Sequence, residues 1–300
     1  MSQAALPVWR SMLFVPVTVE KYVERAAERG ADALILDLED SVPPAEKPRG
    51  RDVLQDAAEA VAKNGADVVV RINRPLRMAL PDIEAAVSPM VQALMLTKVE
   101  SAEHVQMLAE VVDEIEAARG MALGSTKFVA LVETASGFLR LPEIARAHPR
   151  LVALSIGAED FALSVGMLPE AEGLFFPKQQ MIIAARAAGI LPLGFLGTVA
   201  DFRDLDAFRS TIRRSRRLGF MGASCIHPSQ VAILNEEYRP SPDEVAAAER
   251  AVAAYDTATT AGIGAIELDG KMIDVPVIER AKHVLARHRA VLAREARARN

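Results

Sequence analysis

The apolar residues of this chain gather in short continuous runs rather than in alternating patterns. Each run is six to eight residues long and rich in aliphatic and β-branched side chains. Runs of this length without polar alternation are typical of parallel strands that are covered on both faces. The sequence therefore predicts strands at 11–16, 33–38, 67–73, 93–98, 127–133, 151–158, 191–197 and 222–228.

Helical patterns separate these runs, and several of them end at a glycine, such as Gly30 or Gly65, that suits a helix C-cap. Only the third connection, 81–90, is weak, because Pro81 and Pro89 bracket it. Eight strand–helix units over about 230 residues predict an α/β protein with a closed (β/α)8 TIM barrel. An open, doubly wound sheet is the alternative, since periodicity alone does not show closure.

The sequence after the eighth unit exceeds what a barrel needs. Another helix is predicted after Ser241, which forms a capping box with Glu244. A short hairpin and a long helix are predicted to follow. We therefore expect two domains, a catalytic barrel over 1–240 and a C-terminal helix and lid extension over 241–300. The extension is either a packing appendage or a lid over an active site.

Composition excludes several classes of partner. The chain has 300 residues, of which 51% are hydrophobic, with a formal net charge of −5 and a pI near 5.7. No strongly basic field is present for nucleic acid, and no apolar run approaches the roughly 20 residues of a membrane span. The single cysteine, Cys225, fits a reducing compartment. Since the start also lacks a signal-peptide pattern, we expect a cytoplasmic protein that binds neither nucleic acid nor membrane.

Two carboxylates close neighbouring apolar runs. Glu133 ends the fifth run, and Asp160 follows the sixth. In a parallel barrel the carboxyl ends of all strands form one rim, which carries the active site. The pair therefore predicts a site for a hard cation, most simply Mg²⁺. Asp160 taken alone is as well explained as a helix N-cap, whereas Glu133, if buried, needs a cation or several donors.

Other charged residues stand at strand ends as well. Arg71 follows three core valines in VVVRIN, so its guanidinium must be paired, either with Glu39 or Asp40 or with an anionic ligand. Both pairings are compatible, because the acidic residues can orient Arg71 towards a substrate carboxylate. Lys98 fits a structural ion pair as well as catalysis, and His227 is better explained as a hydrogen-bonded structural histidine.

Several nucleotide and hydrolase motifs are absent. The chain contains no Walker-type G-x-x-x-x-G-K, no G-x-G-x-x-G after a strand and no G-x-S-x-G elbow. This disfavours phosphoryl transfer from ATP and nicotinamide redox chemistry. Gly157 and Ala158 instead precede a predicted helix, whose first N–H groups are suited to hold a carboxylate.

Eight motifs with these residues follow one another in the order RSMLFVP, ALILDLEDSVPPAEK, VVRIN, LTKVE, VETASG, GAEDFALSVG, CIHPSQV and GKMIDVP. Together, over roughly residues 10–290, they resemble the citrate lyase β-subunit-like family, which includes malyl-CoA, β-methylmalyl-CoA and citramalyl-CoA lyases. The resemblance implies a (β/α)8 barrel with a C-terminal lid. It also implies a homo-oligomer, a trimer or hexamer, in which the lid of one subunit covers the active site of its neighbour.

The resemblance implies a metal and an anion site. Glu133 and Asp160 match the Mg²⁺ ligands of the family, and we expect Mn²⁺ to substitute. Arg71 matches the arginine that binds the carboxylate or carbonyl oxygen of the acid product. Glu39 and Asp40 match the acidic pair behind the metal and the arginine.

The resemblance also implies a lid residue and a carboxylate-binding turn. Asp274 in GKMIDVP matches the lid aspartate that handles the proton on the α-carbon of the thioester. Backbone groups of Gly157, Ala158 and Glu159 match those that would bind the substrate carboxylate.

Two segments depart from the family pattern. Val17 and Thr18 stand where many relatives have a glycine, in a loop that borders the CoA site of relatives. We expect Phe14, Arg10 and Lys21 to be the CoA contacts of this chain. The seventh run, LGFLGTV, is less polar than the resemblance implies, so the acyl substituent is expected to differ.

These residues together predict a Mg²⁺-dependent carbon–carbon lyase. It would reversibly cleave a 3-hydroxyacyl-CoA, such as malyl-CoA, β-methylmalyl-CoA or citramalyl-CoA, into acetyl- or propionyl-CoA and a 2-oxo acid, glyoxylate or pyruvate. The alternatives are a citrate lyase β subunit acting on a carrier-bound citryl thioester, a malyl-CoA thioesterase, and a metal-dependent aldolase of free oxo acids. A non-enzymatic scaffold is disfavoured, because Glu133, Asp160, Arg71 and Asp274 occur together.

Overall fold

The chain divides into two compact units, Met1–Tyr238 and Arg239–Asn300, each of which is described by itself. The structure is a computed structural model that describes residues 6–198, 203–260 and 264–297. Val199, the last residue of the stretch LGFLGTV, the last residues of the predicted helix after Ser241, and the final three residues lie outside these ranges.

The first unit is built around eight strands. These are β1 (Ser11–Pro16), β2 (Ala33–Asp37), β3 (Asp67–Ile72), β4 (Ala93–Leu96), β5 (Lys127–Val132), β6 (Leu151–Ile156), β7 (Leu191–Leu193) and β8 (Ala223–Cys225). They pair in parallel in the order β7-β6-β5-β4-β3-β2-β1-β8. The two ends of this sheet also meet, because the Gly194 amide donates to the Gly222 carbonyl at 2.8 Å and Leu193 bridges Gly222 in parallel. The barrel prediction is therefore confirmed, and the open sheet is excluded.

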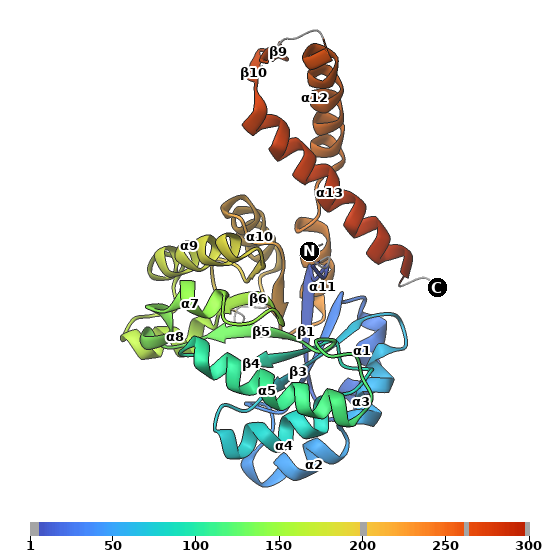
Figure 1. The fold of residues 1–300 in the computed structure, drawn as a ribbon, viewed down its shortest axis with the longest axis vertical. Helices are drawn as coiled ribbons and strands as arrows, with labels where there is room; N and C mark the ends of the chain where they lie inside the picture. The colour runs from blue at the N-terminus through green and yellow to red at the C-terminus, as the bar shows by residue number, and fades with distance from the viewer. Residues whose placement is uncertain (1–5, 199–202, 261–263, 298–300) are drawn as a thin grey trace. The chain divides into compact units, whose positions relative to one another are not determined.

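Helices follow most of the strands on the outside of the barrel (Figure 1). They are α1 (Glu20–Ala26), α2 (Lys47–Asp52), α3 (Leu54–Ala62), α4 (Leu76–Ala86), α5 (Ala102–Ala118), α6 (Ala135–Phe138), α7 (Leu141–Ala145), α8 (Ala158–Val165), α9 (Ala171–Ala188), α10 (Leu205–Leu218) and α11 (Ser229–Glu237), with 3-10 turns η1 (Ala27–Arg29) and η2 (Pro44–Glu46). The helix α4 forms despite Pro81, because Ala79, Ile83 and Ala86 bury one face of it. The third connection is thus a full helix rather than the weak element that its prolines predicted.

The core of the first unit has two layers. The larger one lies between the strands and the surrounding helices and contains residues such as Leu34, Val70 and Phe128. The smaller one fills the lumen, with Met12, Ile35, Val69, Met95, Val129 and Leu193 among its members. The filled lumen closes the barrel from below, so a ligand has access only at the carboxyl ends of the strands.

The last two strands are shorter than the sequence predicted. The predicted segment 191–197 leaves the strand at Gly194, whose φ of 132° lies in a region that L side chains rarely adopt. The predicted segment 222–228 likewise keeps only three residues in β8. Both ends turn into loops at the mouth of the barrel instead.

The second unit is a helical hairpin with a small β-hairpin. Its elements are α12 (Pro242–Thr260), β9 (Ile266–Leu268), β10 (Lys271–Ile273) and α13 (Val275–Arg297). The predicted capping box forms, since the Ser241 amide donates to Glu244 at 2.7 Å and the Glu244 amide donates to the Ser241 hydroxyl at 3.2 Å. Asp269 and Gly270, both with positive φ, make the tight turn between β9 and β10. No helix in the described ranges is long and apolar enough to cross a bilayer.

Closure of the barrel predicts one highly sensitive glycine. A Cβ at Gly222 would lie 1.7 Å from the carbonyl oxygen of Trp9, so Gly222→Ala must push β8 away from the start of β1. We expect this change to lower the free energy of unfolding by about 3 kcal/mol in urea titrations. Gly264→Ala is the control, because its Cβ meets nothing within 4 Å and should change stability by less than about 0.5 kcal/mol. Equal stability of both variants would contradict the close packing of Gly222 against the backbone of Trp9.

Candidate active site

Arg71 is the most heavily paired cation at the mouth of the barrel. It lies beside Asp37 in the register of β2 and β3, and its guanidinium donates two hydrogen bonds to Asp37, each 2.7 Å long. The same guanidinium forms ion pairs with Glu39 at 2.8 Å and Asp40 at 3.1 Å. The central carbon of the guanidinium, Cζ, lies 4.8 Å from the centre of the Phe14 ring. The three acidic residues and the Phe14 ring thus fix the orientation of the guanidinium.

The charges around Arg71 stabilise one another. Burial opposes the charge of Arg71, but the hydrogen bonds to Asp37 and the charges of Glu39 and Asp40 raise the pKa of this guanidinium above its usual value. Burial likewise opposes the charge of Asp37, yet Arg71 and the Ser41 hydrogen bond lower the pKa of this carboxyl. Arg71 therefore stays cationic and Asp37 anionic at neutral pH.

Asp37 is the main partner of this arginine. The sequence had instead indicated Glu39 and Asp40 for that role. The side chain of Asp37 is 2% exposed, whereas that of Asp40 is 67% exposed. Asp37 also accepts the backbone amides of Glu39 and Ser41. The signal was present, since Asp37 is the charged residue within the second apolar run, and as the last residue of β2 it lies at the level of Arg71 in the next strand.

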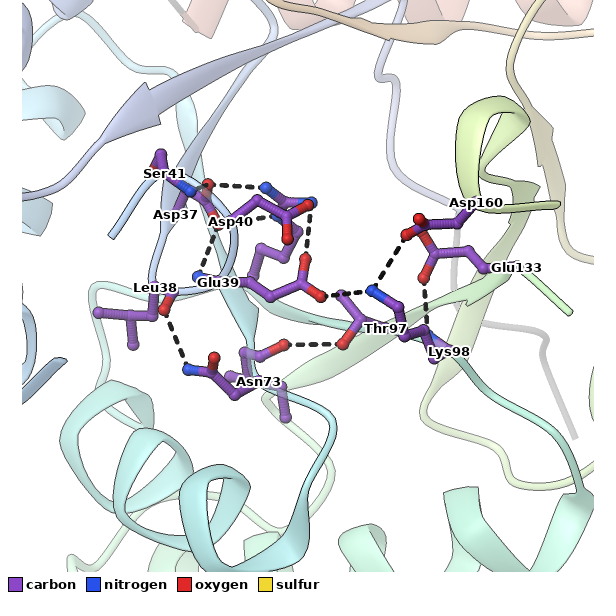
Figure 2. A network of polar contacts seen from close by, with 12 residues as sticks. Asp37, Leu38, Glu39, Asp40, Ser41, Asn73, Thr97, Lys98, Glu133 and Asp160 are labelled. Carbon is purple, nitrogen blue, oxygen red and sulfur yellow. Dashed lines mark hydrogen bonds and ion pairs between the residues drawn. The ribbon is translucent and has the colours of Figure 1, made fainter. Parts of the chain in front are cut away.

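Glu39 connects the arginine to a second cation. Its loop is held by Lys47, whose buried ammonium donates to the carbonyls of Leu38 and Glu39 at 2.6 Å each. The Glu39 carboxylate itself accepts a 2.9 Å bond from Lys98. Burial is the main cause that raises the pKa of Glu39, and the charges of Arg71 and Lys98 counteract it. The carboxylate thus bridges the two cations (Figure 2).

The predicted metal ligands Glu133 and Asp160 lie close together in Figure 2 and share Lys98 as a partner. The Lys98 amide donates to Glu133 at 2.8 Å, and its ammonium lies 3.0 Å from Asp160. Glu133 is 4% exposed, and burial raises its pKa to about 7, with the nearby carboxylates of Glu39 and Asp160 adding to the effect. Glu133 therefore occupies an environment that favours an additional cation.

Gly157 makes room for Glu133. A Cβ at this position would lie 2.6 Å from a carboxylate oxygen of Glu133, so only glycine fits. The Gly157 amide donates to the Val132 carbonyl at 3.1 Å and is not available to a ligand, which corrects the predicted donor role of Gly157. The first amides of α8, on Ala158 and Glu159, have no acceptor within their own helix and suit an anion.

These residues surround one cavity of about 200 Å³. That is smaller than the roughly 300–1,000 Å³ of pockets that enclose drug-sized ligands, so it suits a small acid. Its lining brings together Phe14, Asp40, Arg71, Glu133, Gly157, Ala158, Glu159 and Asp160, and adds Leu131, Ser155, Ile156, Lys178, Gly194, Phe195, Gly197, Thr198 and Ser224.

Lys178 is a cavity residue that strand-end reasoning could not find, because it lies in the middle of α9. It is 3% exposed, and its ammonium donates to the carbonyls of Phe195 and Gly197. Burial lowers its pKa to about 7, opposed by the charge of Glu159. Its position among the buried Leu174 and Met181 of the same helix was the available signal.

The three residues predicted to contact CoA lie in different parts of the first unit. Phe14 lines the cavity, and Lys21 is exposed in the first turn of α1, with its ammonium 5.1 Å from the Tyr22 ring. Arg10 is a wrong prediction. It precedes β1, at the closed end of the barrel, where it is 3% exposed and bonded through two nitrogens to Asp32 at 2.8 and 2.9 Å.

Asp274 belongs to the second unit, where it follows β10 and precedes α13. Its carboxylate accepts a 3.4 Å hydrogen bond from the Val277 amide, and its carbonyl accepts one from the Ile278 amide at 3.0 Å. Asp274 is therefore the N-cap of α13 in this structure. His227, interpreted from sequence as structural, lies 2.7 Å from the Ser229 hydroxyl.

The chain belongs to the HpcH/HpaI aldolase/citrate lyase family, whose model matches residues 10–228. It is 36% identical over 281 residues to citrate lyase subunit beta of Escherichia coli K12, covering 93% of this chain and 92% of that protein. It is 33% identical to a (3S)-malyl-CoA thioesterase of Cereibacter sphaeroides, covering 95% and 96%. It is 34% identical to the L-malyl-CoA/beta-methylmalyl-CoA lyase of Rhodobacter capsulatus, covering 92% and 93%.

A solved structure agrees with this membership. The protein CitE of Mycobacterium tuberculosis, in complex with magnesium, acetoacetate and coenzyme A, is 32% identical and has a TM-score of 0.70 over 95% of this chain and 99% of that one. The present chain is thus an enzyme of the citrate lyase β-like, CoA-ester lyase family. The relatives share the fold but carry out different reactions.

The residues present fit a magnesium ion. Glu133 and Asp160 offer hard oxygen donors, and burial, with a smaller effect of the carboxylates of Glu39 and Asp160, raises the pKa of Glu133, so that a cation beside it would stabilise its charged form. Within the described ranges no three His, Cys, Asp or Glu side chains form a metal-holding group. Two carboxylates are nevertheless a common protein contribution for Mg²⁺, which keeps several waters and substrate oxygens as its other ligands.

This environment predicts how magnesium binding responds to pH. A carboxyl with a pKa of about 7 is mostly protonated below that pH and must lose its proton to bind a cation. Mg²⁺ affinity, measured by calorimetry, should therefore fall from pH 8 to pH 6 by up to about tenfold. Titrations in buffers of different ionisation enthalpy should show proton release at pH 6 and little at pH 8. Equal affinity at both values would contradict the environment assigned to Glu133.

Proposed function

We propose that the protein is a Mg²⁺-dependent lyase that reversibly cleaves a 3-hydroxyacyl-CoA into acetyl- or propionyl-CoA and a 2-oxo acid. Malyl-CoA, β-methylmalyl-CoA and citramalyl-CoA are the candidate substrates, with glyoxylate or pyruvate as the acid. One observation carries the proposal, namely that Arg71 lines the same small cavity as the carboxylates of Glu133 and Asp160.

The cavity supplies the parts that a 2-oxo acid requires. Glu133 and Asp160 would hold Mg²⁺, which as a Lewis acid polarises the carbonyl of the oxo acid. The amides of Ala158 and Glu159 would bind the acid's carboxylate. Arg71 then faces the carbonyl oxygen and stabilises the negative charge that develops on it. Because Asp37 fixes the guanidinium through two bonds, this stabilisation requires little reorganisation during the reaction.

The proton on the acyl group needs a separate residue. We assign it to Asp274, which in the synthetic direction takes the proton from the α-carbon of the thioester and in the cleavage direction returns it. In this proposal the second unit is a lid that covers the active site of a neighbouring subunit in a trimer or hexamer. A closed lid would exclude water from the carbanion-like species.

Two other functions are supported by particular relatives. The citrate lyase β subunit of E. coli is similar to this chain over nearly its whole length, and so is the C. sphaeroides malyl-CoA thioesterase. A thioesterase would direct water at the thioester within the same site. We favour the lyase because Arg71 and the two candidate metal ligands line one small cavity, an arrangement that suits an oxo acid and its carbonyl.

A substrate panel separates the three reactions. Wild-type protein with Mg²⁺ and malyl-, β-methylmalyl- or citramalyl-CoA should release acyl-CoA and oxo acid in equal amounts. Release of free thiol without oxo acid would instead indicate a thioesterase, and activity only on a carrier-bound citryl thioester would indicate a citrate lyase subunit. Glu133→Gln should lower turnover by about a hundredfold or more while its circular dichroism stays unchanged.

Asp274 can be tested without removing its helix cap. Asparagine caps a helix about as well as aspartate but cannot accept a proton, so Asp274→Asn should retain the melting temperature of the wild type. Turnover should nevertheless fall by about 10²- to 10⁴-fold, the usual contribution of an acid–base group. Asp243→Asn, an exposed acid in the first turn of α12, is the control and should be fully active. Wild-type turnover of Asp274→Asn would remove Asp274 from the mechanism.

A further inference from the structure

Lys98 contacts both of the carboxylates that would hold the metal, although neither the motifs nor the mechanism above gives it a role. Its backbone amide donates to Glu133 at 2.8 Å. Its ammonium lies 3.0 Å from Asp160 and 2.9 Å from Glu39. Figure 2 shows this ammonium between the two acidic side chains.

The backbone of Lys98 is held in an unusual conformation. Its φ of 48° places it in the left-handed region, which a lysine rarely adopts and which costs free energy. Three bonds fix it there: the amide to Glu133, the carbonyl that accepts from Arg74 at 3.2 Å, and the next amide, on Val99, which donates to Leu131 at 3.0 Å. In this conformation the one residue contacts both carboxylates, through its amide and through its ammonium.

The two carboxylates that pair with the ammonium differ in exposure. The Lys98 side chain is 34% exposed, whereas that of Glu39 is 9% exposed and bonded to Arg71 as well. The Asp160 side chain is 37% exposed. The contact with Asp160 is therefore the more exposed of the two ion pairs and the one that an incoming cation reaches first.

We propose that Lys98 is an internal counter-ion of the metal site, which a divalent cation displaces from Asp160 while Lys98 keeps its contact with Glu39. The inference rests on the metal ligands of the proposed function. An ammonium and a divalent cation on the same carboxylate compete for its oxygens and repel each other. Lys98 thus weakens the binding of the bare cation and holds the carboxylates in place until it arrives.

The sign of one measurement tests this role. If Lys98 competes with the cation, Lys98→Met should bind Mg²⁺ about tenfold more tightly than the wild type in calorimetry without substrate. If Lys98 only maintains the structure of the site, its removal should weaken Mg²⁺ binding. Unchanged or weaker binding by Lys98→Met would therefore overturn the proposal.

Two further variants complete the test. Lys98→Gln keeps hydrogen-bond donors near both carboxylates without the charge, and it should also bind Mg²⁺ more tightly, so it replaces Lys98→Met if that variant does not fold. Lys127→Met removes an equal charge, from an ammonium that donates to the Gly124 carbonyl before β5, and should bind Mg²⁺ within twofold of the wild type. Equal tightening in Lys127→Met would show a mere effect of net charge and contradict the proposal.

The outcome can be separated from that of the proposed lyase. Tighter binding in Lys98→Met together with no lyase activity of the wild type on any thioester would support the counter-ion and refute the lyase. Lyase activity without tighter binding would do the reverse. A wild type and a Lys98→Met protein that both fail to bind Mg²⁺ at 10 mM would refute both.

Discussion

The mouth of the barrel depends on one electrostatic constraint, the concentration of carboxylates at the ends of parallel strands. Glu39 and Glu133 are buried and lie near Asp160, and each would be unstable as an isolated anion. The described chain balances them with Arg71, which β3 carries and Asp37 of β2 fixes, and with the more exposed Lys98. Since burial still raises the pKa of Glu133 to about 7, a divalent cation on the side of β5 and β6 would stabilise this carboxylate further.

Much of this arrangement could be predicted, because in a closed parallel barrel every residue at the carboxyl end of a strand lies on the same rim. Any polar residue at the end of an apolar run reaches the same rim, which sufficed for Glu133 and Arg71. Arg10 was expected near CoA from the resemblance of its segment, but it precedes β1 and therefore lies at the opposite end of the barrel, as the same rule requires. The rule says nothing about residues within helices, and for that reason it did not identify Lys178. It also does not tell which acid of a cluster binds the arginine, and for that reason Asp37 was not identified as the main partner of Arg71.

An acid that stabilises the start of a helix in this protein can also take part in the proposed chemistry. Asp160 lies in the first turn of α8, where a carboxylate also interacts favourably with the helix dipole. Asp274 accepts the Val277 amide at the start of α13. In each case the helix end orients the side chain through one hydrogen bond or through the helix dipole, and leaves oxygen lone pairs for another partner. The helix starts therefore position these carboxylates and still leave oxygen atoms available for a cation or a substrate.

The relatives show that the charged rim does not by itself select the reaction. Proteins named as a citrate lyase subunit, a malyl-CoA lyase and a malyl-CoA thioesterase are all 33–36% identical to this chain. A lyase and a thioesterase both need the acid end of the substrate held, but they differ in what reaches the thioester: a proton donor and acceptor, or a water molecule. The selection must therefore depend on groups other than these charges, and Phe195, Gly197 and Thr198, which follow β7, line the cavity together with Lys178. Lys178 donates to the carbonyls of Phe195 and Gly197, so it fixes these two residues at the cavity wall, where a difference between relatives would change what reaches the thioester.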